Sequence, residues 1–159
     1  MTRSEIITEL KKYFDITELV CPDTYNAFKD TSWQFLDTEE LHLLLVLRRD
    51  IFKAPMTINN YHNGGSFSQR GFRCNLCDLV KSKTLSGKIY LSAHATGAGM
   101  DADIKGITAA EARQKIKDNE ALLPYPIRLE ATTSGKPCTW LHFDKYDNGS
   151  GKMIVEFAG

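Results

Sequence analysis

Apolar residues recur at helical spacing near the start of the chain. Ile6, Ile7, Leu10 and Phe14 follow the i, i+3, i+4, i+7 stripe of a helix that packs on a core. This pattern predicts a helix over residues 4–14, and a short helical turn is expected after Pro22.

The clearest helical pattern covers residues 38–52. Thr38 can cap its start, Glu39 and Glu40 lie in its electropositive first turn, and two arginines lie near its electronegative end. The interior, LHLLLVL, is almost wholly apolar. We therefore expect this helix at the centre of the core.

Alternation of apolar and polar positions then indicates strands. Residues 56–60 (MTINN) and 88–94 (KIYLSAH) both alternate, and the second segment opens into a glycine-bearing stretch. Residues 75–83 between them predict a helix. Thr108 and Glu111 form a capping box, which predicts a further helix that runs to about residue 117.

The last third of the chain is typical of an antiparallel sheet. PIRLEATT, a turn at SGKP and CTWLHFD predict a hairpin, and MIVEF predicts one more strand. Because helices come first and the mostly antiparallel sheet comes late, the expected fold class is α+β. No repeat or linker divides the chain, so we expect residues 1–159 to form a single compact domain.

Composition and charge exclude several classes of function. The 159 residues are 42% hydrophobic and 25% charged, and no apolar run is long enough to span a membrane. The 20 Lys and Arg balance the 20 Asp and Glu, so no basic surplus is available for phosphate backbones. We expect a monomer with no membrane span and no nucleic-acid partner.

The N-terminal segment MTRSEIITELKKYFD is charged throughout and lacks the apolar core of a signal peptide. We therefore expect a protein that is cytoplasmic as made. In that compartment Cys21, Cys74, Cys77 and Cys138 are expected to be reduced thiols rather than a disulfide framework.

Two histidines and an aspartate have a spacing that suits a metal. Asp101 follows His94 by seven residues across a glycine-bearing loop, and glycines let the chain fold back so that both side chains converge. Imidazole and carboxylate are ordinary zinc ligands, a catalytic zinc takes three protein ligands plus water, and His142 is the natural third. The alternative is an ordinary loop hydrogen bond between His94 and Asp101, with His142 a residue of an edge strand.

Two carboxylates of the hairpin are candidate general bases. A turn near residues 135–136 places Glu130 across from Leu141 or His142, and in the second case Glu130 and His142 project from one face. A carboxylate beside a zinc ligand can take a proton from water. Asp144 shares the face of His142 and competes for this role, although its short side chain is also placed to orient a ligand. The simpler alternative is that Glu130 is an exposed strand residue.

Two motifs resemble a known family. Residues 92–101, SAHATGAGMD, are similar to the S-x-H-x-x-G-x-A-x-D signature of the zinc D-Ala-D-Ala carboxypeptidase family, which includes D,D-dipeptidases and the L-alanyl-D-glutamate peptidase endolysins of phages. WLH at 140–142 is similar to its W-x-H element, and FDITELVCP, MTINNYHNGGSFSQRGFR and the closing hairpin extend the similarity. The resemblance implies the hedgehog/DD-peptidase-like fold and the zinc ligands His94, Asp101 and His142.

The chain departs from the family pattern at two positions. Gly99 stands where the family has alanine. Thr139 stands three residues before His142, where the family often has its catalytic acid, so Glu130 has to act from the neighbouring strand.

The resemblance also implies residues that hold the substrate. A peptidase that trims a free carboxyl end needs a fixed guanidinium, and the resemblance favours Arg73 for this role. It implies Ser92 as a hydrogen-bonding group for substrate. The alternative is that Arg70 and Arg73 are both solvated surface residues.

Cys74 and Cys77 form a CxxC pair, the spacing of a structural zinc site. Cys21 and Cys138 are distant along the chain, so we expect no second site and about one zinc per chain. The sequon at Asn148 matches a glycosylation signal in letters only.

Together these features predict a zinc-dependent peptidase acting on bacterial peptidoglycan stem peptides, with D,D or L,D specificity. A phage-type lysin, released to the cell wall by a holin-type partner, fits the missing export signal, and a cytoplasmic dipeptidase fits it equally. The alternative is a non-catalytic, zinc-containing module on the same fold that binds cell wall or a protein partner.

Overall fold

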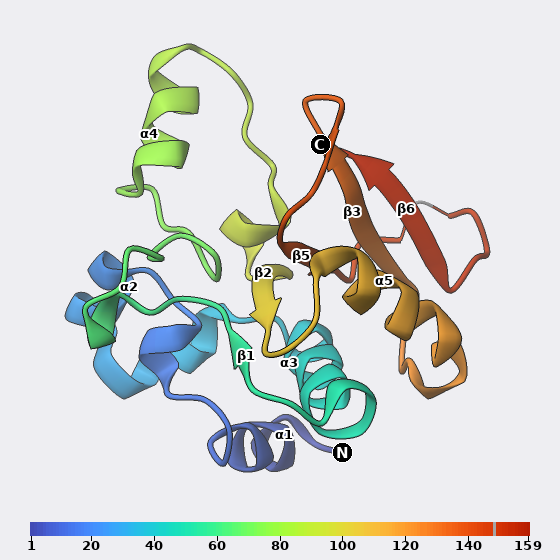
Figure 1. Cartoon of the computed structure of the whole chain (residues 1–159). Coiled ribbons are helices and arrows are strands. Elements are labelled where there is room, and N and C mark those ends of the chain that lie inside the picture. The colour runs from blue at the N-terminus through green and yellow to red at the C-terminus, as the bar shows by residue number, and fades with distance from the viewer. Residues whose placement is uncertain (148) are drawn as a thin grey trace.

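The first half of the chain is helical. The computed structural model describes residues 1–147 and 149–159, so the sequon residue Asn148 lies outside the described residues. Helices α1 (Arg3–Leu10), α2 (Pro22–Phe28) and α3 (Thr38–Val46) lie on one side of the molecule, joined by 3₁₀ turns (Figure 1). Helix α1 ends four residues earlier than the sequence predicts, and Phe14 is buried in the turn that follows.

Helix α3 is the central core helix, as its sequence predicts. It continues as a π-helix over Leu47–Phe52, so the helical segment covers the expected range. Its cap is Asp37 and not Thr38. The Asp37 carboxylate accepts hydrogen bonds from the backbone N–H groups of Glu39 and Glu40, whereas the Thr38 hydroxyl accepts one from Arg3.

The described residues form a six-stranded sheet, mostly from the second half of the chain, in the order β1-β2-β5-β3-β4, with β6 also paired to β3. The strands are β1 (Met56–Thr57), β2 (Gly99–Ile104), β3 (Ile127–Thr133), β4 (Lys136–Pro137), β5 (Leu141–Asp144) and β6 (Ile154–Ala158). All pairings are antiparallel except that of β6 with β3. The expected α+β class is confirmed, and the predicted strand 56–60 is reduced to two residues.

A tight turn joins β3 to β4. Ser134 and Gly135 both have left-handed backbones, with φ of 49° and 75°, as a two-residue hairpin of the right twist requires. Strand β5 then passes between β2 and β3, with Arg128 opposite Asp144 and Leu129 opposite Phe143. This register decides which side chains of β3 and β5 are neighbours.

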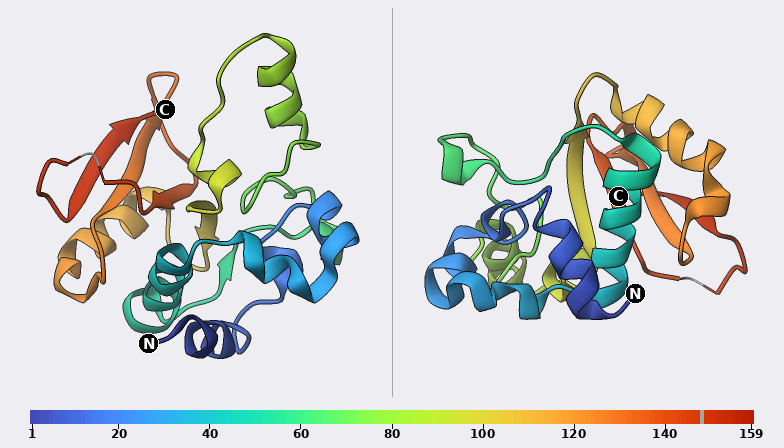
Figure 2. Two further views of the ribbon diagram at one scale, coloured as in Figure 1. Left: turned by 180° about the vertical axis from the view of Figure 1, so that it is seen from behind. Right: turned by 90° about the horizontal axis from the view of Figure 1, so that it is seen from below.

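Helix α5 (Ala109–Asp118) lies against β2 and β5 and buries Ala112 and Ile116 (Figure 2). The predicted capping box is confirmed, because Thr108 and Glu111 bond each other's backbone N–H groups. None of the helices in the described ranges has the length and apolar character that crossing a membrane requires.

Residues 78–92 form an arm that projects from the body and carries α4 (Asp78–Leu85) (Figure 1). No residue of the arm is buried. The predicted strand over residues 88–94 is wrong: Ile89 and Leu91 are 86% and 77% exposed, and no neighbouring strand pairs with them among the described residues. Apolar alternation makes a strand only where a partner strand and a core face receive it.

Candidate metal centre

Three side chains from three elements converge at the centre of the sheet. His94 lies in the 3₁₀ helix η5 (Ala93–Thr96), Asp101 in β2 and His142 in β5, where Asp101 and His142 are direct cross-strand partners. One ligand atom from each lies within 4.8 Å of the other two, and all three residues are buried. The structure therefore brings together the three residues that the spacing selects.

Two glycines make this convergence possible. Gly97 ends η5 with φ of 72°, and a Cβ there would lie 2.1 Å from the carbonyl oxygen of Phe35. At Gly99 a Cβ would lie 2.6 Å from the Ala93 Cβ and 2.9 Å from the Asp144 Cβ. The chain can turn from His94 into β2 only with a bare backbone at these positions.

The hydrogen bond of His94 fixes which ring nitrogen is free. Its Nδ1 lies 2.9 Å from the backbone oxygen of Gly71, which can only accept, so Nδ1 carries the proton. Burial lowers the pKa of His94, although Asp101 opposes that shift, and the ring is neutral. Its Nε2 lone pair then faces an Asp101 carboxylate oxygen at 3.3 Å. Two electron-rich atoms at this distance are stabilised by a cation between them.

His142 is held between two carboxylates. Its Nδ1 lies 2.7 Å from Asp101, and its Nε2 lies 3.0 Å from Asp144. Burial disfavours the imidazolium, but the hydrogen bonds to Asp101 and Asp144 outweigh it and raise the pKa of His142 to about 9. Without a metal, His142 is therefore protonated at neutral pH.

Asp144 is held by contacts with Arg128, His142 and the backbone of Tyr146. It is fully buried, and its carboxylate accepts two hydrogen bonds from Arg128, at 2.9 and 2.8 Å, and one from the backbone N–H of Tyr146. Burial opposes ionisation, but the bonds to His142 and Arg128 prevail and lower the pKa of Asp144. A carboxylate that holds the second nitrogen of a histidine is the usual support of a metal ligand.

Glu130 lies beside His142 and faces a cavity. Continued by one residue, the register of β3 and β5 puts Glu130 opposite His142. Glu130 is half-buried, and burial raises its pKa, with the nearby His142 opposing the shift. Of the two candidate bases, Glu130 is the one whose carboxylate is not committed to an ion pair with arginine in the described part of the chain.

The cavity has a volume of about 530 Å³. The three converging residues lie in its lining, together with Glu130 and residues of the arm. Its further polar or aromatic lining includes Arg73, Tyr90, Ser92, Arg128 and Trp140. The buried donor set therefore lies at the wall of a cavity that a small molecule could enter.

Arg73 and Ser92 both line this cavity. Each also makes hydrogen bonds within the protein that the sequence does not predict. The Arg73 guanidinium donates to the Tyr90 hydroxyl at 2.6 Å and to Asp101 at 3.3 Å. The Ser92 hydroxyl accepts from the His94 backbone N–H and so caps η5. Arg70, the other arginine of this loop, pairs instead with Asp103 at 2.7 Å.

Sequence reasoning missed two residues behind the site. Arg128 belongs to no motif, and it faces Asp144 in the same register of β3 and β5 that puts Glu130 opposite His142. Glu40, which the sequence places in the first turn of the core helix, is fully buried, and neither of its carboxylate oxygens has a hydrogen-bond partner in the described part of the chain. Burial raises the pKa of Glu40 well above its usual value, and the nearby Asp144 raises it further. In the sequence, only the position of Glu40 directly before the apolar helix interior indicates that it is buried.

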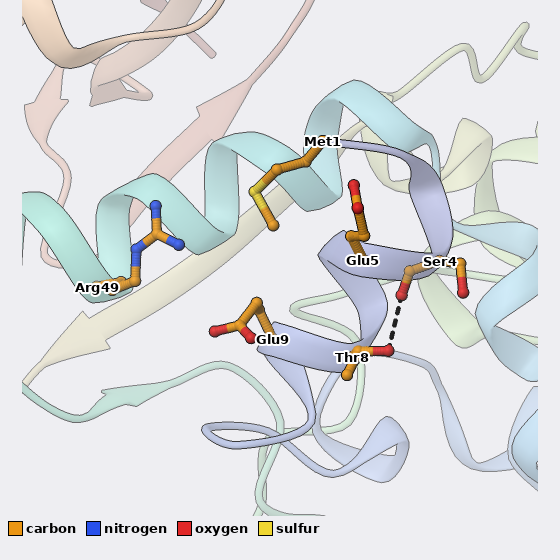
Figure 3. A pocket seen from close by; sticks show the side chains of 6 residues that line it. All are labelled: Met1, Ser4, Glu5, Thr8, Glu9 and Arg49. Carbon is orange, nitrogen blue, oxygen red and sulfur yellow. Dashed lines mark hydrogen bonds between the residues drawn. The ribbon is translucent and has the colours of Figure 1, made fainter.

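A second cavity of about 530 Å³ lies between α1 and the π-helix that follows α3 (Figure 3). Its lining includes Glu5, Glu9 and Arg49, while the Thr8 hydroxyl bonds back to Ser4 within α1. None of the converging residues reaches it.

Comparison of the chain with protein-family models, with curated proteins and with solved structures finds no match.

Proposed function

We propose that this chain is a zinc-dependent peptidase that hydrolyses peptide bonds in bacterial peptidoglycan stem peptides. The observation that carries the proposal is the lone pair of His94 Nε2 facing the Asp101 carboxylate in a buried cluster at the wall of an open cavity. The resemblance of residues 92–101 and 140–142 to the zinc D-Ala-D-Ala carboxypeptidase family supports the choice of substrate class.

The donor set suits zinc. His94, Asp101 and His142 would hold the ion, since two imidazoles and a carboxylate are ordinary zinc ligands and catalytic sites use three. When bound, zinc supplies a Lewis acid that lowers the pKa of water and polarises a carbonyl oxygen. Both imidazoles have the outer partner that such ligands need: Gly71 O holds Nδ1–H of His94, and Asp144 holds Nε2–H of His142.

Glu130 is the general base in this proposal. Its carboxylate takes a proton from the attacking water and returns it to the nitrogen of the leaving amine. The raised pKa of Glu130 makes it a stronger proton acceptor than an exposed glutamate. Its place next to His142, on the cavity wall, puts this acceptor beside the ligands without making it one of them.

Arg73 and Ser92 orient the substrate. The Arg73 guanidinium is the cation of the cavity wall nearest to the ligand Asp101, and a guanidinium can grip a carboxylate at two points. Ser92 offers its hydroxyl from the start of η5. A cavity of this volume accommodates a short peptide rather than a folded protein segment.

The direct test uses zinc-loaded protein and muropeptides of defined stem structure. We expect cleavage of one stem-peptide bond, which mass spectrometry of the products identifies. Glu130→Gln is the matched control, because it keeps the shape of the side chain while removing the proton acceptor. Zinc bound at full occupancy with every stem peptide left intact would reject the peptidase and favour a non-catalytic module.

A further inference from the structure

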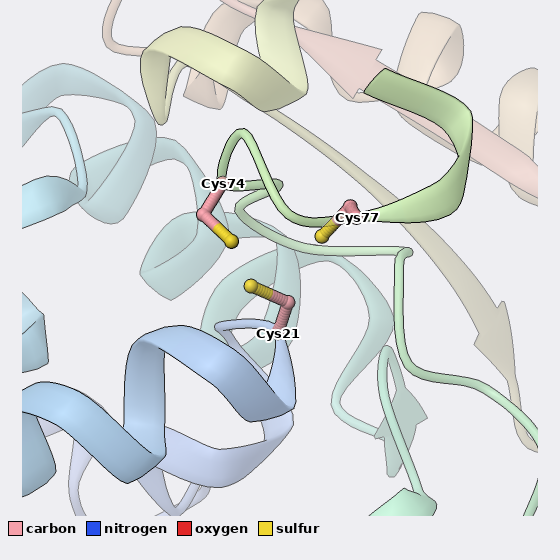
Figure 4. A group of neighbouring side chains, drawn as sticks. All are labelled: Cys21, Cys74 and Cys77. Atoms are coloured by element: carbon pink, nitrogen blue, oxygen red, sulfur yellow. The ribbon is translucent and has the colours of Figure 1, made fainter. Parts of the chain in front are cut away.

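Three thiols converge at the base of the arm, away from the candidate metal centre. Cys21, Cys74 and Cys77 point toward one another (Figure 4), and their sulfur atoms lie within 4.8 Å of one another. All three are free thiols. The sequence predicts no second site because Cys21 is distant along the chain. In the fold, however, Cys21 lies next to Cys74 and Cys77.

Backbone contacts hold the two segments together. The N–H of Cys21 donates to the Phe72 oxygen at 3.1 Å, and the N–H of Phe72 donates to Leu19 at 2.9 Å. Cys21 immediately precedes α2, and Cys77 immediately precedes α4. The thiol cluster therefore joins the helical body to the first turn of the arm.

Two of the three sulfurs have polar partners that can interact with a thiolate. The backbone N–H of Leu76 donates to the Cys74 sulfur at 3.4 Å, and the Thr24 hydroxyl lies 3.1 Å from the Cys21 sulfur. These contacts can support thiolate character at Cys74 and Cys21, the form in which cysteine binds a metal.

We propose that Cys21, Cys74 and Cys77 form a second metal site, which binds a thiophilic divalent cation such as zinc. Three sulfurs bound to one zinc at about 2.3 Å lie about 3.8 Å apart in tetrahedral geometry, so the observed cluster needs only a small contraction. The C-x-x-C spacing of Cys74 and Cys77 is one that zinc sites use. Cys74 is half-buried, and a water molecule supplies the fourth ligand from its side.

The site would fix the arm. No residue of the arm is buried, yet Leu79, Tyr90 and Leu91 line the cavity of the candidate metal centre. The arm is held at its base by few contacts, one of them the bond from the Leu79 N–H to the Gln69 side chain at 3.2 Å. A metal shared by Cys21 of the body and the CxxC pair cross-links this wall of the cavity to the core.

The test uses the full chain with His94→Ala and His142→Ala, so that it does not depend on the proposed peptidase site. Titration of this reduced protein with Cd²⁺ should produce thiolate-to-metal charge-transfer absorption that saturates at about one equivalent. Adding Cys74→Ser should weaken Cd²⁺ binding by at least about tenfold, whereas adding Cys138→Ser should leave it unchanged, because Cys138 is not a member of the cluster. Circular dichroism verifies that each variant is folded, and Cys74 is chosen because it is the least buried ligand.

Trypsin gives a second readout, since Lys81, Lys83 and Lys88 of the arm are exposed. Cd²⁺ should slow cleavage at these lysines in the His94→Ala/His142→Ala protein and have no such effect once Cys74→Ser is added. Absence of the charge-transfer band, or a band that survives Cys74→Ser together with Cys77→Ser, would overturn the site. Binding without protection of the arm would overturn its proposed role as a cross-link.

Discussion

At the scale of residues, the chemistry depends on how two carboxylates of neighbouring strands are used. Asp144 is buried and bonded to Arg128 and His142, whereas Glu130 is half-buried on the cavity wall. Without these partners, a carboxylate at either position would have no defined role. Environment, more than sequence spacing, separates the proton acceptor from the carboxylate that positions a ligand.

Glu130→Gln should lower turnover by about 10² to 10⁴, the usual worth of a positioned general base, with zinc content and melting temperature unchanged. Asp144→Asn should cost less turnover and weaken zinc affinity by roughly 10 to 100-fold, since the carboxylate on His142 Nε2 is lost. Steady-state kinetics with metal analysis of both variants makes the comparison. Near-normal turnover in Glu130→Gln, with collapse in Asp144→Asn at full zinc occupancy, would reverse the two roles.

Metal binding should depend on pH through His142. Its pKa is raised from 6.5 to about 9 in the metal-free protein, so a metal has to displace this proton. Apparent zinc affinity should rise by about tenfold per pH unit up to about pH 9 and then level off. In the metal-free protein the stabilisation by protonated His142 is complete below pH 6.5 and is lost as the pH rises through about 9. Chelator competition and thermal melts across this range measure both effects, and a flat affinity profile would show that His142 is not a ligand.

At the scale of elements, short connections decide the geometry of the site. The turn from η5 into β2 carries Gly97, and the sheet register sets Glu130 opposite His142. Arg73 joins the arm to the site, because it bonds both Tyr90 and Asp101.

Gly97→Ala tests the close approach at that turn. The left-handed backbone costs roughly 1–2 kcal/mol for alanine, and the contact of 2.1 Å with the Phe35 oxygen adds to that cost. Gly135→Ala is the matched control, since Gly135 has φ of 75° but nothing within 4 Å of the added Cβ. Denaturant unfolding should show Gly97→Ala as the more destabilised variant, with weaker zinc binding as well. Equal loss at the two positions would mean that the close approach does not matter.

Arg73→Lys keeps the charge but loses the two-pronged guanidinium. The Michaelis constant should rise chiefly for substrates with a free terminal carboxylate, and amidated substrates should change little. Steady-state kinetics on matched free-acid and amidated peptides measure this difference. If the Michaelis constants of both classes rise equally, Arg73 holds Asp101 and the arm and does not bind the substrate carboxylate.

At the scale of the whole molecule, the sequence predicted the features that depend on local patterns better than those that depend on long-range contacts. The α+β class, the core helix and the capping box of α5 follow from local periodicity and capping chemistry, which the fold respects. The ligand set His94, Asp101 and His142 could be proposed because its spacing is part of a motif. The pairing of Arg128 with Asp144 follows from the same hairpin register that puts Glu130 opposite His142. The placement of Cys21 beside Cys74 depends on chain segments far apart in sequence, so no local pattern could indicate it. The wrong strand at residues 88–94 has the same cause, because a strand needs a partner that local alternation does not supply.

The most direct measurement of the central claim is an anomalous difference map at the zinc absorption edge, from crystals of the protein grown with zinc. We expect a peak about 2.0–2.2 Å from a nitrogen of His94, a nitrogen of His142 and a carboxylate oxygen of Asp101, and we expect this peak to be lost in His142→Ala. A peak at the cysteine cluster alone, with His142 still bonded to both Asp101 and Asp144, would contradict it.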